Sequence, residues 1–457
     1  MSNILRSIIN EIELIPEFQV IGKVCSVRGL LIEAIGIEFA VSIGSKCKII
    51  NKNEREMFAE VVGIKEKKTL LMTYDSAEGI GIGSQVHVIA HDQSVYPSTH
   101  WLGRVINAFG EPIDEKGPLI NGNIPYRLHN TPPKAHLRKR TGAKMDMGIR
   151  SINAFLSCCR GQRMGIFSGS GVGKSMMISM LTKYADADVK IIGLIGERGR
   201  EVQEFLEDYL GEEGLSKAIV VVSTSDESAL KRKQAAYLTM ALCDYYRDQG
   251  KQVLCMMDSI TRFAMAQREI GLSIGEPPTT KGYTPSVFSE LPKLLERAGP
   301  GTKGQGDVTA FFSVLVEGDD HNEPISDAVR GILDGHIVLS RKIAGRGIYP
   351  AIDVLNSISR TMPRCNTEYE NKLVNKARSI ISQYTDMEDM IRIGAYKTGS
   401  DPQVDESIKY IDEINRFISQ NYNEKDTLKD SYLKLAKIIE FDKKPDANEK
   451  NHKSNDL

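Results

Sequence analysis

The sequence predicts an α/β protein in three parts: a small β-barrel, a central domain built on a mostly parallel sheet, and a C-terminal helical domain. Residues 17–92 hold short β-prone runs separated by glycines, which is typical of a small closed barrel. From about residue 141 to 360, apolar strand-like runs alternate with amphipathic helical segments, as in repeated βαβ units. Residues 365–440 are rich in Lys, Glu, Ile and Leu with a helical period.

Composition limits the class of protein before any motif is considered. The 457 residues are enough for two or three domains, and 41% hydrophobic residues allow a sizeable core. A formal net charge of −1 argues against a protein dedicated to nucleic acid. Because the sequence has no signal peptide and no apolar run of transmembrane length, we expect a cytoplasmic protein whose membrane contact is peripheral.

The seven cysteines are scattered along the chain and form no CxxC motif and no Cys/His cluster. Such spacing is unlike a disulfide framework or a zinc site. We therefore expect reduced, mostly buried thiols.

The first segment, residues 1–16, is predicted to be an amphipathic helix. Ser2 or Asn3 is available as its N-cap, Pro16 follows its end, and six apolar residues share one face: Ile4, Leu5, Ile8, Ile9, Ile12 and Ile15. Two interpretations stay open. The helix packs on its own domain, or it detaches to dock a partner or a membrane surface. Because Arg6 is its only basic residue, a partner is favoured over a membrane.

The next domain, residues 17–92, contains six β-prone runs, at 20–24, 29–33, 46–50, 60–64, 69–72 and 85–89. Small barrels often bind oligonucleotides by stacking the bases on aromatic side chains. These runs lack interleaved aromatic residues, so we expect a structural or oligomerisation role.

The central domain is predicted to span residues 93–362. It opens with a connecting segment that includes a basic run from Lys134 to Arg140, which we interpret as a solvated linker. Its candidate strands are 164–168, 190–195, 219–223, 253–258, 309–316 and 335–340. The helical domain is placed at 363–440, and the polar tail at 441–457 is expected to be disordered.

The stretch from Met164 to Val202 carries the strongest functional signal. An apolar run leads into a glycine-rich turn, which ends in Lys-Ser and continues into an apolar helical segment. This order of strand, glycine loop, Lys-Ser and helix is the arrangement of a phosphate-binding P-loop. The residues expected to bind ATP in this loop are Ser168, Gly169, Ser170, Gly171, Val172, Gly173, Lys174 and Ser175.

The residue types of this loop suit a triphosphate. Its three glycines permit φ > 0 and leave no Cβ in the way, so backbone N–H groups and the positive end of the helix can hold a polyanion. Lys174 would reach the β- and γ-phosphates, and Ser175 would ligate Mg²⁺. Ser168 departs from the pattern, because it stands where the first glycine is expected. The alternative, a glycine-rich turn that binds nothing, does not account for the strand and helix on either side.

A second element of the site is the apolar run 253–258, which ends in a carboxylate, Asp258. A continuous apolar run is typical of a parallel strand that is buried on both faces. Ligands bind at the carboxyl ends of such strands, so Asp258 is expected beside the P-loop, where it would hold the water shell of Mg²⁺.

Taken together, these motifs resemble the RecA-like rotary-type ATPases, the superfamily of the F- and V-type catalytic heads and of the flagellar and type III export ATPases. The resemblance spans nearly the whole chain and is closest to the export branch, within which the flagellar enzyme is nearer than that of the injectisome. Family members vary at the position of Ser168. The segments that carry the resemblance are Gly196–Val202, Asp258–Glu269, Gly282–Phe288 and Gly394–Pro402.

The resemblance implies a fold and site roles: a RecA-like P-loop NTPase core in which ATP is hydrolysed with Mg²⁺. Glu197 would polarise the attacking water, and Arg198 would help hold the site. Tyr349 would stack on adenine, and Arg360 would be an arginine finger. The alternatives are a helix-capping carboxylate for Glu197, a buried corner tyrosine for Tyr349 and a buried ion pair for Arg360.

In rotary heads, the arginine finger comes from a neighbouring subunit. Because one chain here carries Lys174, Glu197 and Arg360, the resemblance implies a homo-oligomeric, hexameric ring that completes its own sites. The partners it implies are a regulator or stator protein at the N-terminal helix, a central stalk, chaperone–cargo complexes and an export gate at the inner membrane, with no nucleic acid.

Two polar loops, 275–282 and 317–324, are long enough to line a pore and would contact the stalk or the exported chain; plain solvated loops are the alternative. The expected function is the ATP-hydrolysing motor of flagellar protein export. The alternatives are an injectisome ATPase, a rotary synthase subunit, an RNA translocase and a scaffold that binds nucleotide without hydrolysing it.

Overall fold

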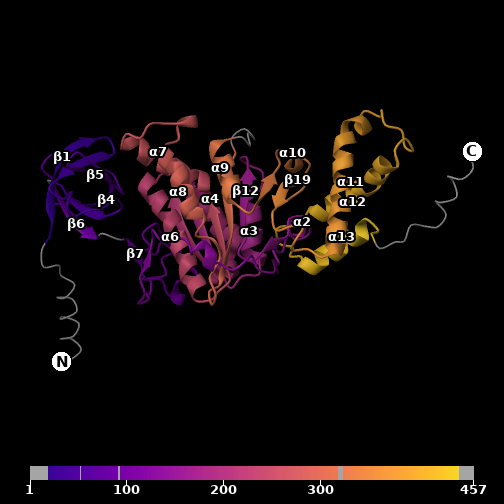
Figure 1. Ribbon diagram of the computed structural model, residues 1–457, viewed down its shortest axis with the longest axis horizontal. Coiled ribbons are helices and arrows are strands. Elements are labelled where there is room, and N and C mark those ends of the chain that lie inside the picture. Colours follow the sequence, from indigo (N-terminus) through magenta and orange to yellow (C-terminus); the bar gives the residue numbers. More distant parts are fainter. Residues whose placement is uncertain (1–18, 52, 91–92, 317–322, 442–457) are drawn as a thin grey trace, which may run out of the picture.

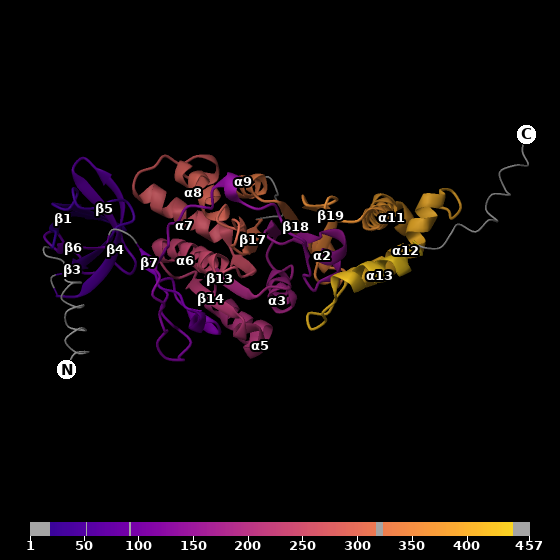
Figure 2. The same ribbon diagram turned by 60° about the horizontal axis from the view of Figure 1, so that its bottom comes forward.

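The computed structural model describes residues 19–51, 53–90, 93–316 and 323–441. A barrel, a sheet domain and a helical domain follow one another along its length (Figure 1), and the same order is seen after a 60° turn (Figure 2). The predicted helix at 1–16 lies outside the described residues, as do the tail from residue 442 and most of the loop at 317–324. Among the residues described, no helix is both long and apolar enough to span a membrane.

The N-terminal domain is a closed six-stranded barrel with strand order β1-β2-β5-β4-β3-β6, as the sequence predicted. Its interior is packed by aliphatic side chains such as Ile32, Ile49 and Leu71, which alternate with outward-facing residues. The strands are β1 (Ile21–Arg28), β2 (Leu31–Ile35), β3 (Lys46–Ile50), β4 (Glu56–Lys65), β5 (Lys68–Thr73) and β6 (Gln85–Ala90).

The central sheet has the strand order β19-β18-β12-β17-β15-β13-β14-β8 and is parallel except at β19, with the short β16 paired to β17. A mostly parallel sheet is therefore confirmed. The strands are β8 (Arg104–Ile106), β12 (Arg163–Ser168), β13 (Val189–Glu197), β14 (Ala218–Thr224), β15 (Val253–Asp258), β16 (Gly299–Pro300), β17 (Asp307–Leu315), β18 (Gly335–Leu339) and β19 (Ile352–Ser359).

Helices cover both faces of this sheet, which is why its inner strands read as continuous apolar runs. On one face lie α6 (Ala229–Asp248), α7 (Ile260–Ser273), α8 (Pro285–Leu295) and α9 (Pro324–Ile332). The other face carries α3 (Lys174–Tyr184), α4 (Gly199–Glu204), a π-helical turn (Phe205–Leu210) and α5 (Gly211–Ser216). Along β13, Ile192 and Leu194 face one side whereas Ile191 and Ile195 face the other.

The C-terminal domain consists of α11 (Glu368–Arg392), α12 (Pro402–Ile418) and α13 (Leu428–Ile438). Its apolar residues, among them Leu373, Ile414 and Leu435, belong to the same buried cluster as α3 and β12. Smaller elements complete the chain: β7 (Ser94–Val95), β9 (Tyr126–Arg127), β10 (Lys144–Met145), β11 (Cys158–Cys159), α2 (Arg150–Phe155), α10 (Arg341–Ala344) and the 3-10 turns Thr99–Trp101, Ala135–Leu137 and Thr280–Gly282.

The structure corrects part of one prediction and confirms another. The basic run 134–140 is largely exposed, but Arg138 is not a solvated linker residue, because its guanidinium donates to the carbonyls of Pro133, Glu296 and Ala298. The guanidinium is bound mainly by carbonyl groups, with the carboxylate of Glu296 4.0 Å away, and composition does not reveal such contacts. The cysteines are free thiols and five of the seven are buried, as expected.

Candidate active site

The P-loop connects β12 to α3 at the carboxyl edge of the sheet. Gly173 is the N-cap of α3 with φ of 85°, and Gly171 has φ of 75°. Only these two glycines of the loop have positive φ, so the prediction of φ > 0 is wrong for Gly169. A Cβ on Gly173 would also lie 3.1 Å from Cδ1 of Tyr349, so this position needs glycine for two reasons.

Lys174, the first residue of α3, stands between two carboxylates. Its Nζ lies 2.6 Å from Oδ1 of Asp258 and 3.3 Å from Oε1 of Glu197, and the three side chains are 7–12% exposed. Burial alone would lower the pKa of Lys174, but the charges of Asp258 and Glu197 outweigh it and raise that pKa. The lysine is therefore held charged, at the place where a triphosphate would need it.

Glu197 is the last residue of β13, and its direction is set by a bulge. The pairing of β13 with β14 shifts register between Ile195 and Glu197, and Gly196 between them has φ of 69°. A Cβ on Gly196 would lie 2.7 Å from Cβ of Arg262. Burial first, and then the charge of Asp258, raise the pKa of Glu197 to about 7, although Lys174 opposes the shift. A carboxyl with this pKa can act as a proton acceptor near neutral pH.

Asp258 ends β15, as the apolar run predicted, and it is buried. Its Oδ1 accepts a hydrogen bond from the hydroxyl of Ser313 as well as from Lys174. Sequence reasoning missed Ser313. It lies near the end of β17, which is paired in parallel with β15, so the order of strands in the sheet would have identified it.

The other predicted loop residues differ in exposure. Ser168 is 1% exposed and its hydroxyl has no hydrogen-bond partner among the described residues. Val172 is buried, Ser175 is half-buried in the first turn of α3, and Ser170 is exposed.

Tyr349 follows α10 and is half-buried against the P-loop, as the contact with Gly173 shows. Its carbonyl accepts a hydrogen bond of 2.7 Å from the backbone N–H of Gln420 in the C-terminal domain. A ring next to the glycine loop is where an adenine base could stack. The alternative, a buried tyrosine at a strand–loop corner, fits only in part, because Tyr349 is half-buried.

Two predicted site residues are not brought to this cluster. Arg198 has a side chain that is 81% exposed and lies 3.8 Å from Glu201. Arg360 follows β19, which runs antiparallel to β18, so it lies at the edge where the parallel strands begin. It is exposed and donates to the carbonyl of Arg330 at 3.2 Å, so the buried ion pair is wrong.

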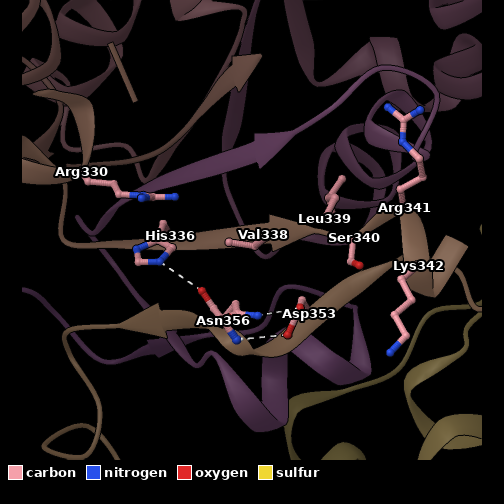
Figure 3. Close-up of a pocket in the computed structure, with 9 residues that line it drawn as sticks. All are labelled: Arg330, His336, Val338, Leu339, Ser340, Arg341, Lys342, Asp353 and Asn356. Carbon is pink, nitrogen blue, oxygen red and sulfur yellow. Dashed lines mark hydrogen bonds between the residues drawn. The ribbon is translucent and has the colours of Figure 1, made fainter. Parts of the chain in front are cut away.

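A basic cavity of about 500 Å³ lies beside β18 and β19 (Figure 3). Four basic residues, Arg330, His336, Arg341 and Lys342, line it together with one acid, Asp353. Arg341 reaches the carbonyl of Ser170 in the P-loop at 3.5 Å. The cavity is therefore next to the P-loop but is made of other residues than those the sequence singled out.

Comparisons with known proteins agree along most of the chain. Models of the ATP synthase alpha/beta family match residues 17–87 (β-barrel domain) and 148–359 (nucleotide-binding domain), and a model of the T3SS EscN ATPase C-terminal domain matches residues 367–437. The flagellum-specific ATP synthase of Caulobacter vibrioides is 54% identical, covering 95% of this chain and 99% of that protein. That of Bacillus subtilis is 49% identical, covering 95% and 98%.

Among solved structures, the assembled ATPase EscN of the enteropathogenic E. coli type III secretion system superposes with a TM-score of 0.86 at 39% identity, covering 92% of this chain and 100% of that chain. EscN in complex with its central stalk EscO gives a TM-score of 0.83 with the same identity and coverage.

Proposed function

This chain belongs to the ATP synthase alpha/beta family and, within it, to the flagellum-specific ATP synthases, and on that premise we propose that it is the ATP-hydrolysing motor of a flagellar protein export apparatus. The chain is an ATPase. The observation that carries its chemistry is the placement of Lys174 between Glu197 and Asp258 at the end of a glycine loop.

In this proposal the P-loop backbone and Lys174 hold the β- and γ-phosphates. When ATP binds, its phosphates compete with the two carboxylates for Lys174. Glu197 is then free to orient and polarise a water molecule for attack on the γ-phosphate, and its pKa of about 7 suits that role. Arg198 turns in from its exposed position to help hold the phosphates, and Tyr349 stacks on adenine.

The oxygen donors of this edge fit Mg²⁺, which prefers carboxylate, hydroxyl and water ligands. We assign Ser175 as a direct ligand and Asp258 as the residue that holds the water shell. Both contacts of Asp258 are made by Oδ1, which leaves Oδ2 for that shell. The metal would neutralise charge that develops on the phosphates.

We assign Arg360 to the site of a neighbouring copy. Within one chain it lies at the opposite edge of the sheet from Lys174, so it cannot serve its own P-loop without rearrangement. A closed ring of identical subunits, six in our proposal, brings the arginine of one copy to the phosphates of the next. EscN, which is similar throughout, has been solved as an assembled ATPase.

The remaining partners follow from the resemblance. EscN binds a central stalk, EscO, and we propose an equivalent stalk partner here, contacted by the loop 275–282 and by residues 317–324. We further propose that the segment 1–16 docks a regulator or stator, that the ring unloads cargo from export chaperones, and that it works against an export gate, on the cytoplasmic face of the inner membrane.

A type III secretion role is the second candidate, because a T3SS EscN domain model and the EscN structures match this chain as well. The two are separated by complementation. The chain is expected to restore motility to a strain without its flagellar export ATPase, and to leave secretion absent in a strain without its injectisome ATPase. The reverse result would assign the chain to the injectisome.

The enzymatic proposal is tested by phosphate release from ATP at increasing protein concentration. We expect the rate per subunit to rise steeply as rings form, and Glu197→Gln to leave only a small residual rate of hydrolysis while ATP still binds. Hydrolysis at full rate by separated protomers would contradict the shared site. An RNA translocase would instead show tight, salt-sensitive RNA binding in a filter assay.

A further inference from the structure

The segment from Ser340 to Ala351, here called the tyrosine loop, connects β18 to β19 and carries Tyr349 to the P-loop. It begins with the short helix α10 and is half-buried or exposed up to Tyr349. Such a loop has few buried contacts of its own, so its position depends on what holds it from outside.

One contact comes from Glu388 on α11 of the C-terminal domain. Its side chain is 8% exposed and accepts hydrogen bonds from Lys342 at 3.1 Å and from Arg346. The two cations are more exposed, at 67% and 37%. The hydrogen bond from Arg346 is the main reason why the pKa of Glu388 lies below its ordinary value, so the carboxylate is ionised at neutral pH.

Figure 3 shows two consecutive residues at the start of this loop. Arg341 and Lys342 leave the backbone in opposite directions, Arg341 towards the P-loop and Lys342 towards the ribbon of the C-terminal domain. Consecutive residues of the loop thus contact the nucleotide-binding edge and the helical domain.

A second contact ties the same loop to the same domain. Gln420, just after α12, is 3% exposed and donates its backbone N–H to the carbonyl of Tyr349. Its side chain donates to the carbonyl of Gly148 at 2.8 Å and accepts from the N–H of Arg150 at 2.8 Å. Gln420 therefore anchors the backbone of Tyr349, whereas Glu388 anchors the start of the loop.

The apolar packing under the loop is incomplete. A cavity of about 150 Å³ lies between the tyrosine loop and helices α11 and α12, lined by Ile343, Ile348, Ile381 and Ile411 among others. Because apolar contact does not fill this space, charged hydrogen bonds have a larger share in setting where the loop sits.

We propose that Glu388 is a positioning residue for nucleotide binding: through Lys342 and Arg346 it holds the tyrosine loop so that Tyr349 is presented at the P-loop. The inference rests on the proposed function, in which Tyr349 contacts adenine. It also makes the C-terminal helical domain sensitive to the nucleotide, because coupling between two sites is reciprocal: whatever moves α11 changes ATP affinity, and ATP binding favours one position of α11.

The test is Glu388→Gln in the full-length protein, which removes the charge and keeps the shape. We expect the KM for ATP to rise about tenfold and kcat to stay within about twofold, since the loop acts on binding rather than on the phosphates. Inorganic tripolyphosphate, which has no base, should inhibit with unchanged affinity. The matched control is Glu406→Gln, which breaks an ion pair of 2.9 Å with Lys376 inside the same domain and should leave KM unchanged.

Two double variants make the outcome decisive. In a Tyr349→Ala background, Glu388→Gln should add no further change in KM, because the residue through which it acts is gone. The exchange of charges in Arg346→Glu with Glu388→Arg should restore part of the affinity that Glu388→Gln loses.

The two levels of the proposal fail in different ways. If Tyr349→Ala raises the KM for ATP and Glu388→Gln does not, or if Glu388→Gln lowers only kcat or thermal stability, the role of Glu388 is overturned and that of Tyr349 stands. If Tyr349→Ala itself leaves the KM for ATP unchanged, the adenine contact is wrong and the positioning role falls with it.

Discussion

The two edges of the central sheet differ in how they hold their charged residues. At the carboxyl edge, Lys174, Glu197 and Asp258 are largely buried, and Lys174 is bonded to both carboxylates. At the opposite edge, Arg360 is exposed, and its guanidinium contacts a backbone carbonyl. The carboxyl edge therefore carries a preorganised cluster of charges, whereas the opposite edge carries an exposed arginine that can change its conformation.

In our proposal, this difference means that one chain holds the parts of a hydrolytic site without assembling them. Preorganised charge at the P-loop stabilises bound phosphates at little cost of reorganisation. An exposed arginine contributes to catalysis only when a neighbour brings phosphates to it. The following predictions test this contrast, from the largest expected effect to the smallest.

Replacing the exposed charge should have the largest effect on turnover. Arg360→Ala is expected to lower kcat by about 10³–10⁵-fold, the range of arginine fingers, because charge on the transferring phosphoryl group loses its partner. ATP binding should remain, since the P-loop is intact. Steady-state phosphate release and equilibrium nucleotide binding measure the two quantities, and normal turnover in this variant would remove Arg360 from the mechanism.

Mixing two inactive variants should restore activity if the P-loop of one subunit and Arg360 of its neighbour form one site. Lys174→Ala lacks the P-loop charge and keeps the arginine, and Arg360→Ala has the reverse defect. In rings assembled from equal amounts, about a quarter of the interfaces combine an intact P-loop with an intact arginine. We expect up to about that share of wild-type hydrolysis. Mixtures as inactive as their components would show that the site lies within one chain.

The raised pKa of Glu197 at the carboxyl edge should make kcat/KM depend on pH. Glu197 must be ionised to accept a proton, and its pKa is raised to about 7 by burial and by Asp258, so kcat/KM should fall about tenfold per pH unit below 7 and level off above it. ATP itself titrates in this range, so the control is the residual rate of Glu197→Gln, which should lack that limb. If the activity of both proteins falls equally below pH 7, the pH dependence comes from titration of ATP and not from Glu197.

The smallest expected effect is on the free energy of unfolding, which should fall more for a substitution at the carboxyl edge than for one at the opposite edge. Lys174→Met leaves Glu197 and Asp258 together without a counter-charge, and we expect it to lower the free energy of unfolding by about 3 kcal/mol. Arg360→Ala should change it by less than about 0.5 kcal/mol because the side chain is exposed. Thermal unfolding of the two variants side by side measures this, and equal shifts would mean that the contrast in burial has no energetic counterpart.

Much of the fold could be predicted from residue patterns. Continuous apolar runs identified the inner strands β12, β13, β14, β15, β17 and β18, because burial on both faces removes alternation. Two edge strands were missed. β8 is three residues long, and β19 has the mixed burial of a strand at the margin of the sheet, so neither produces such a run.

The site residues likewise include some that could be predicted from the sequence and some that could not. Lys174 and Asp258 were predictable as neighbours, because a P-loop and the end of an adjacent parallel strand share one edge. Ser313 was not, because nothing local marks a serine inside a buried strand until β17 is known to lie beside β15. Arg138 was misread, because the carbonyls that bind its guanidinium come mostly from a segment more than 150 residues away.

The sequence by itself determined the P-loop, the barrel and the helical end, since glycine spacing and hydrophobic period act over short stretches of chain. Tertiary structure alone decided that Glu197 turns inward at a bulge and that Arg360 lies at the opposite edge of the sheet. It also decided that Glu388 binds Lys342 and Arg346 of the tyrosine loop. These depend on strand order and on contacts between distant segments, which no local pattern encodes.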